Sequence, residues 1–229
     1  MKFKIFQTTS IKANIISNFI GNGWGAFLSI FFVPIYLKYI GAEGYGLIGI
    51  FASLQVVLSL LDSGLSTTLN KEIARLSVLP DTQQQIKNLV KTLGTVYWGL
   101  SIIAGIIALG LSPLIANYWV QPNALSISTI TYAFILLSGS IIFQLPSGFY
   151  SGGLMGLHRQ VLLNIIKIAF STIRSFGSVF ILIYISNSVL VFFGWALIVN
   201  IIQAFTLRYY LWANLPSTTI MAIFDKEEL

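Results

Sequence analysis

The sequence has no cysteine, a single histidine and few charges. Charged side chains make up 9% of its 229 residues, whereas soluble domains carry roughly 25%. Without cysteine, disulfide bonds and thiolate-based metal or redox sites are excluded. So few charges could not cover the surface of a soluble protein of this size, and 56% of the residues are hydrophobic. Together with a mean hydropathy of +0.84, the composition predicts an integral membrane protein.

Motifs of soluble catalysis are also missing. His158 stands beside Arg159 in a short polar segment, where a lone histidine is expected to be solvated. The sequence contains no nucleophile elbow, no Walker loop and no cluster of metal ligands. A glycine-rich stretch at residues 41–46 lacks the lysine of a phosphate-binding loop, so it predicts a tight turn. We therefore expect no enzyme activity, no metal and no cofactor, and any transport must be driven by a gradient rather than by ATP.

Long apolar runs predict an all-α fold with six transmembrane helices, because about 20 apolar residues cross the hydrocarbon core of a bilayer. The expected helices cover residues 14–37, 46–68, 89–115, 127–154, 161–185 and 189–212. The second is expected to continue in water through Ala74. Residues 1–212 would thus form one transmembrane lobe. Residues 213–229, with Pro216 and a charged end, predict a cytoplasmic linker in which the chain is cut short.

The distribution of lysine and arginine predicts the orientation, since cytoplasmic loops carry the excess of these residues. Lys38 is alone on one side of the predicted helices. Ten basic residues fall on the other side: Lys2, Lys4, Lys12, Lys71, Arg75, Lys87, Lys91, Arg159, Arg208 and Lys226. Both termini are therefore predicted to be cytoplasmic, as an even number of crossings requires. The net charge of +6 is explained by this topology, and no nucleic-acid partner is expected.

Two cations lie inside the fifth predicted helix. Arg174 is about 13 residues from its start, which at 1.5 Å per residue places it roughly 20 Å into the membrane. Lys167 lies seven residues earlier, or about two turns, so both fall on one face. Ionisable groups at such depth usually face a bundle interior. Either they line a cationic cavity for an anionic ligand, or Lys167 extends to the interface and Arg174 pairs with a buried carboxylate.

Other polar residues within the predicted helices are candidates for the same cavity. Asp62 is the only carboxylate in a predicted span, and it is either a structural counter-ion to Lys167 or Arg174 or a carboxylate that couples transport to an ion. Asn18 and Asn22 are four residues apart and share a helix face. Gln144 lies in the fourth helix. Such amides serve either as ligand contacts or as hydrogen bonds between helices.

Three segments carry a resemblance to a known family. They are Gly41-Ala-Glu-Gly-Tyr-Gly, the stretch from Leu61 to Arg75 (LDSGLSTTLNKEIAR), and Gly153-Leu-Met-Gly-Leu-His-Arg with Asn164 after it. In their order and spacing they resemble the first outer turn, the exit of the second helix and the fourth-to-fifth loop of polysaccharide flippases. These O-antigen and oligosaccharide-lipid flippases belong to the multidrug/oligosaccharidyl-lipid/polysaccharide exporter superfamily, and the resemblance runs over nearly the whole chain.

The resemblance implies a MATE-like fold, in which two six-helix lobes face a central cavity, and this chain is similar to the first lobe. It implies transfer of an undecaprenyl-pyrophosphate-linked oligosaccharide across the bacterial cytoplasmic (inner) membrane for surface polysaccharide and lipopolysaccharide synthesis. Arg174 and Lys167, with Asn18, Asn22 and Gln144, would contact this substrate. Arginine suits bidentate phosphate contacts. The implied partners are the lipid-linked oligosaccharide, membrane lipids and a second lobe or other polysaccharide-assembly proteins.

Three alternatives stay open. A cation-coupled multidrug exporter of the same superfamily would carry more acidic residues in its cavity, and only Asp62 fits. A membrane-embedded glycan polymerase or ligase would need a large outer loop with arginine and histidine, and the predicted outer loops are short. A non-transporting assembly subunit is compatible with the length of the chain.

Overall fold

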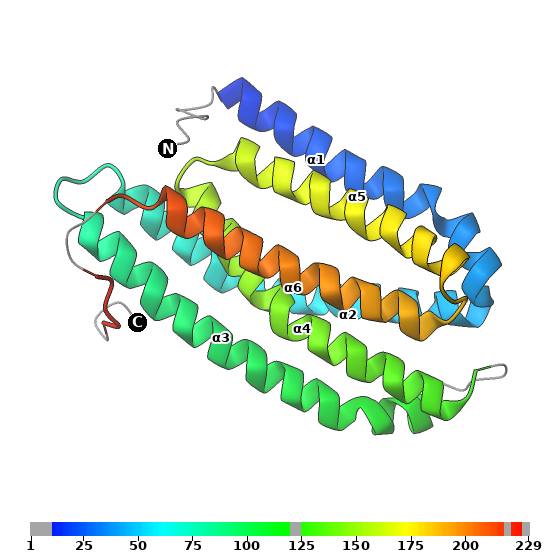
Figure 1. Ribbon diagram of the computed structural model, residues 1–229. Coiled ribbons are helices and arrows are strands. Elements are labelled where there is room, and N and C mark those ends of the chain that lie inside the picture. Colours follow the sequence, from blue (N-terminus) through cyan, green and yellow to red (C-terminus); the bar gives the residue numbers. More distant parts are fainter. Residues whose placement is uncertain (1–10, 120–124, 218–220, 226–229) are drawn as a thin grey trace.

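A computed structural model shows a bundle of long α-helices (Figure 1). It describes residues 11–119, 125–217 and 221–225, apart from the side chains of residues 11, 60–63, 65 and 119. The helices are α1 (Ile11–Phe31), α2 (Val33–Leu76), α3 (Gln83–Leu114), α4 (Ile127–Gly156), α5 (Gln160–Tyr184) and α6 (Val189–Asn214), with a π-helical turn, Ile115–Trp119, after α3. No strand occurs in the described ranges.

The central helix of the bundle is α4, which packs along α2, α3 and α6, while α5 packs against α1 and α6. In Figure 1, α1 and α5 lie side by side at one edge and α3 lies at the opposite edge. Short connections join α4 to α5 and α5 to α6, so consecutive helices run antiparallel. The start of α1 and the end of α6 therefore lie at the same end of the bundle.

The basic residues gather at this end. Lys71 and Arg75 lie near the end of α2, Lys87 and Lys91 near the start of α3, and Arg208 near the end of α6. We call this the basic end of the bundle. Arg75 pairs with Glu72 at 2.8 Å on the surface of α2.

The connection between the first two predicted helices is shorter than the loop expected at residues 38–45. Helical backbone continues on both sides of Gly41, which alone departs from it with φ of 74° and ψ of 171°. A positive φ costs glycine little because it has no Cβ, so one residue suffices to break the helix. The chain turns back near this point (Figure 1). Beyond the turn, α2 continues to Leu76, two residues past the expected end of its extension at Ala74.

Five stretches of the described chain are long and apolar enough to cross a membrane. They are Val33–Ser59, Gln83–Tyr118, Ile127–Gly156, Gln160–Tyr184 and Val189–Asn214. Helix α1 has 21 residues and is not among them, because its sequence includes Lys12, Asn14, Ser17, Asn18 and Asn22. The structure thus indicates an all-helical, multi-pass membrane protein with at least five apolar helices.

Two hydrophobic cores hold the bundle together, one at each end. The core at the basic end includes Ile73, Phe149, Leu163 and Leu211. The core at the opposite end includes Leu28, Phe134, Leu182 and Phe193. Buried polar side chains lie between them, where α5 and α6 face each other. The candidate site occupies this middle layer.

Candidate functional site

A cavity of about 350 Å³ opens between α1, α5 and α6 in the middle layer of the bundle. Polar and basic residues line the side formed by α5 and α6, namely Lys167, Ser171, Arg174 and Gln203. The side formed by α1 consists of Gly21, Asn22, Gly25 and Ala26. The helical spacing of the three α5 residues directs them to one face, as expected for positions three, four and seven apart. Three of the residues expected to bind substrate, Asn22, Lys167 and Arg174, thus lie in one cavity.

Arg174 is held by neutral amides. Its Nη2 donates to Oδ1 of Asn200 at 2.6 Å and to Oε1 of Gln203 at 3.0 Å. The backbone carbonyl of Arg174 accepts hydrogen bonds from Oγ of Ser178 at 2.6 Å and from Nε1 of Trp195 at 3.3 Å. Both the guanidinium and its backbone are therefore fixed from α6. The carboxylate partner considered for Arg174 is not found among the described side chains.

Two donors on the cationic side chains of the cavity have no acceptor in the described part of the chain. The Nε of Arg174 is shielded from solvent and makes no hydrogen bond. Lys167 is half-buried and makes no hydrogen bond or ion pair with a described side chain. A buried cation without a counter-ion is costly. Two positive charges and no described carboxylate line this cavity, so its electrostatics favour an anion.

Asn18 lies beside the cavity in a separate polar cluster. Nδ2 of Asn164 on α5 donates to Oδ1 of Asn18 at 2.6 Å and to Oγ of Ser17 at 3.0 Å. Gly21 makes room for this cluster, since a Cβ there would approach Oδ1 of Asn164 to 2.9 Å. These two hydrogen bonds link α1 to α5. Asn18 thus makes a hydrogen bond between helices in this structure, and its contact with a substrate stays a prediction.

Gln144 and Asp62 are the two remaining candidates from the sequence. Gln144 of α4 accepts a hydrogen bond from Nε2 of Gln55 on α2 at 3.2 Å, and it does not line the cavity. The structure therefore separates Gln144 from the other substrate-contact candidates. The backbone of Asp62 belongs to α2, but its side chain is outside the described residues. Its pairing with Lys167 or Arg174 stays a prediction.

Asn200 and Gln203, the partners of Arg174, were not predicted from the sequence. The sequence does contain a signal for the contact between Arg174 and Asn200. Arg174 and Asn200 each lie 13 residues from Asn187 in the turn between α5 and α6, and a tight antiparallel hairpin places such positions level. The turn is fixed by Ser188, whose Oγ accepts from the backbone N–H of Leu190 at 3.2 Å and caps α6.

These features define a helical membrane protein with a cationic cavity among three of its helices. Comparison with known proteins adds no name to this class: no family model, no curated protein and no solved structure matches the chain. The functional conclusion therefore depends on the geometry of the cavity and on the sequence resemblance.

Proposed function

We propose that the chain is one lobe of a transporter that moves an undecaprenyl-pyrophosphate-linked oligosaccharide across the bacterial cytoplasmic membrane. In this proposal α1 crosses the membrane with the five more apolar helices, and the lobe is the first half of a MATE-like pair. The basic end of the bundle faces the cytoplasm, because lysine and arginine collect on that side. A second six-helix lobe would close the substrate pathway.

The observation that carries this proposal is the set of neutral hydrogen-bond partners around Arg174. Its guanidinium is held by two neutral amides, at 2.6 and 3.0 Å, and Lys167 lies in the same cavity. Amide acceptors orient the guanidinium without neutralising it. The cavity therefore keeps two positive charges for a ligand, and a pyrophosphate group carries the negative charges and acceptor oxygens that match them.

The position of the cavity also supports a lipid-linked substrate. A pyrophosphate cannot enter hydrocarbon without replacing its hydration, and Arg174 supplies hydrogen-bond donors at membrane depth. The exposed apolar residues Phe19 and Ile20 of α1 and Ile173 of α5 lie on the surrounding helices, where a polyprenyl tail could remain in lipid. Relative motion of two lobes around such a site would give alternating access.

The proposal is tested in cells whose surface polysaccharide export depends on the protein that contains this chain. Arg174→Ala and Asp62→Asn are compared at matched expression in the membrane. We expect Arg174→Ala to lower the exported glycan strongly and Asp62→Asn to keep most of it. Normal export with Arg174→Ala, together with loss of export with Asp62→Asn, would overturn the proposal in favour of a cation-coupled exporter.

A further inference from the structure

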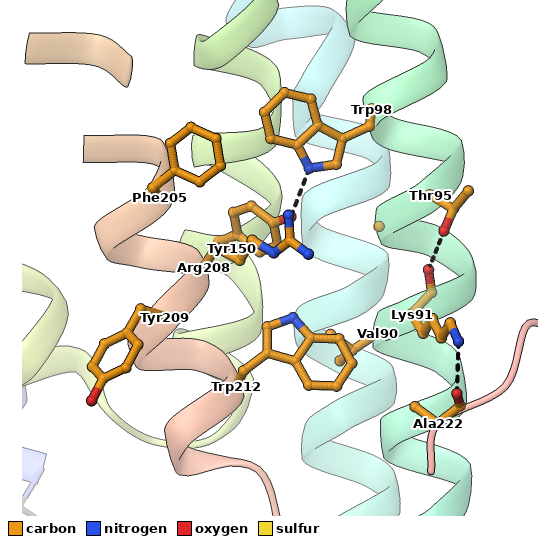
Figure 2. Close-up of a pocket in the computed structure, with 11 residues that line it drawn as sticks. Val90, Lys91, Thr95, Trp98, Tyr150, Phe205, Arg208, Tyr209, Trp212 and Ala222 are labelled. Carbon is orange, nitrogen blue, oxygen red and sulfur yellow. Dashed lines mark hydrogen bonds between the residues drawn. The ribbon is translucent and has the colours of Figure 1, made fainter. Parts of the chain in front are cut away.

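A second and larger cavity lies at the basic end of the bundle, away from Arg174. It measures about 660 Å³ and is bounded by α3, α4, α6 and residue Ala222. Both α3 and α6 pack along α4 rather than along each other, so a groove remains between them with Tyr150 of α4 as its floor. Figure 2 shows Trp98 and Trp212 at its two ends, with Arg208 between them. This site is independent of the proposed transport function.

Hydrogen-bond donors converge on this cavity from three helices. Tyr150 accepts from Nε1 of Trp98 at 2.8 Å, so its own hydroxyl hydrogen is free to donate. Arg208 is exposed and makes no hydrogen bond with a described residue. The indole nitrogen of Trp212 also has no described partner, and it is on the side of the ring that faces Arg208 (Figure 2). No carboxylate is among the described residues that line the cavity, so these donors together favour an anion.

Lys91 adds a second cation and closes the lower wall. Its Nζ donates to the backbone carbonyl of Ala222 at 2.8 Å, which leaves two of its N–H groups for a ligand. The neighbouring backbone is held to α3 as well, because the N–H of Ile223 donates to Oδ1 of Asn88 at 3.0 Å. Ala222, in the described stretch 221–225, thus forms part of the cavity wall.

The remaining walls are apolar and aromatic. Phe205 stacks on Trp98 with ring centroids 6.2 Å apart, and Tyr209 lies on the same side of the cavity. Tryptophan and tyrosine are enriched at membrane–water interfaces, and Trp212 is two residues from the end of α6. The cavity is therefore amphipathic, as expected of a site where the headgroup layer meets the hydrocarbon.

We propose that this cavity binds the phosphate headgroup of an anionic phospholipid. Arg208, Lys91 and the N–H of Trp212 contact the phosphate, and the start of an acyl chain lies against Phe205 and Trp98. A zwitterionic lipid fits less well, since its ammonium would face two cations with no carboxylate among the described lining residues. Occupation of the groove would join α3 to α6 at the basic end.

The test measures equilibrium binding to the purified full chain in neutral detergent. Phosphatidylglycerol and phosphatidylcholine, each with a fluorescent acyl chain, are titrated by fluorescence anisotropy, and glycerol phosphate serves as a soluble competitor. We expect phosphatidylglycerol to bind in preference to phosphatidylcholine. Arg208→Gln should weaken its binding about tenfold, as loss of a charge-assisted hydrogen bond predicts. Arg208→Lys should restore part of the affinity.

Two further variants test the indole N–H of Trp212 and the specificity of the effect for cations in the cavity. Trp212→Phe keeps the ring and removes only the N–H, and should weaken binding roughly threefold. Lys71→Gln removes a cation from the same end of the bundle without touching the cavity, and should bind as the wild type does. Unchanged binding with both Arg208→Gln and Trp212→Phe, or equal binding of both lipids, would overturn the proposal. So would displacement by glycerol phosphate at the concentration at which the lipid binds, which would indicate a site for free phosphoesters.

Discussion

Arg174 and Asn200 meet across the α5–α6 hairpin, where Nη2 of the guanidinium donates to the amide oxygen at 2.6 Å. The acceptor is neutral, so the bond orients the cation and leaves its charge in place. A carboxylate in the same position would have formed an internal ion pair. The difference between an amide and a carboxylate at residue 200 therefore decides whether the cavity is available to an anion.

Replacing that amide by a carboxylate gives the first prediction. Asn200→Asp should pair with Arg174 and weaken binding of a polyprenyl pyrophosphate about tenfold, because one of the two positive charges is neutralised. The measurement is a binding titration in detergent. Asn214→Asp makes the same change at the end of α6, outside the cavity, and should leave the affinity unchanged. Equal affinity of all three proteins would contradict the charge argument.

Access of water to the cavity can be tested with thiol chemistry, since the natural chain has no cysteine. Ser171 lines the cavity, whereas Ile173 on the same helix is 47% exposed on the outer surface and should face lipid. In membranes, Ser171→Cys should react with a water-soluble methanethiosulfonate and Ile173→Cys should not. An anionic reagent should modify Ser171→Cys faster than a cationic one. The opposite charge preference would count against a cationic cavity.

The orientation in the membrane is testable in the same cysteine-free background. His158 lies in the connection between α4 and α5 at the basic end, and Ser186 lies in the turn between α5 and α6. We expect His158→Cys to be labelled by an impermeant reagent only after the cells are opened, and Ser186→Cys to be labelled in intact cells. Labelling of Ser186→Cys from the cytoplasm alone would reverse the predicted topology.

The packing of α4 against α2 depends on a close approach at Gly152. A Cβ at this position would come within 2.5 Å of the backbone oxygen of Ser66, so Gly152→Val must separate the two helices. We expect a loss of roughly 1–3 kcal/mol of stability, typical of overpacking, seen as a lower melting temperature in detergent. At Gly99 nothing lies within 4 Å of a Cβ, and Gly99→Val should melt near the wild type. Identical melting of the two variants would contradict the contact.

Much of the secondary structure could be predicted because the length of an apolar run sets the length of a membrane helix. The four later helices begin and end within a few residues of the expected bounds, apart from the earlier start of α3 at Gln83. The turn at Gly41 was expected as a loop of several residues. One glycine with positive φ replaces it, and local sequence alone does not distinguish these two solutions.

Most of the candidate site that was predicted lies on a single helix. Spacing along α5 places Lys167 and Arg174 on one face, and both line the cavity. Contacts between helices depend on packing, and the periodicity along one helix does not contain them; only the equal separation of Arg174 and Asn200 from Asn187 pointed to one. For that reason Asn200 and Gln203 were missed, and Gln144 was expected near the cavity although it bonds to Gln55.

The central claim is that Arg174 binds a pyrophosphate-linked lipid, and equilibrium binding tests it most directly. A fluorescent polyprenyl pyrophosphate is titrated against the wild type, Arg174→Gln, Asp62→Asn and, as a charge-matched control, Arg159→Gln in the connection between α4 and α5. The account predicts that Arg174→Gln binds at least about tenfold more weakly, while Asp62→Asn and Arg159→Gln stay close to the wild type. Binding by Arg174→Gln with the affinity of the wild type would contradict it.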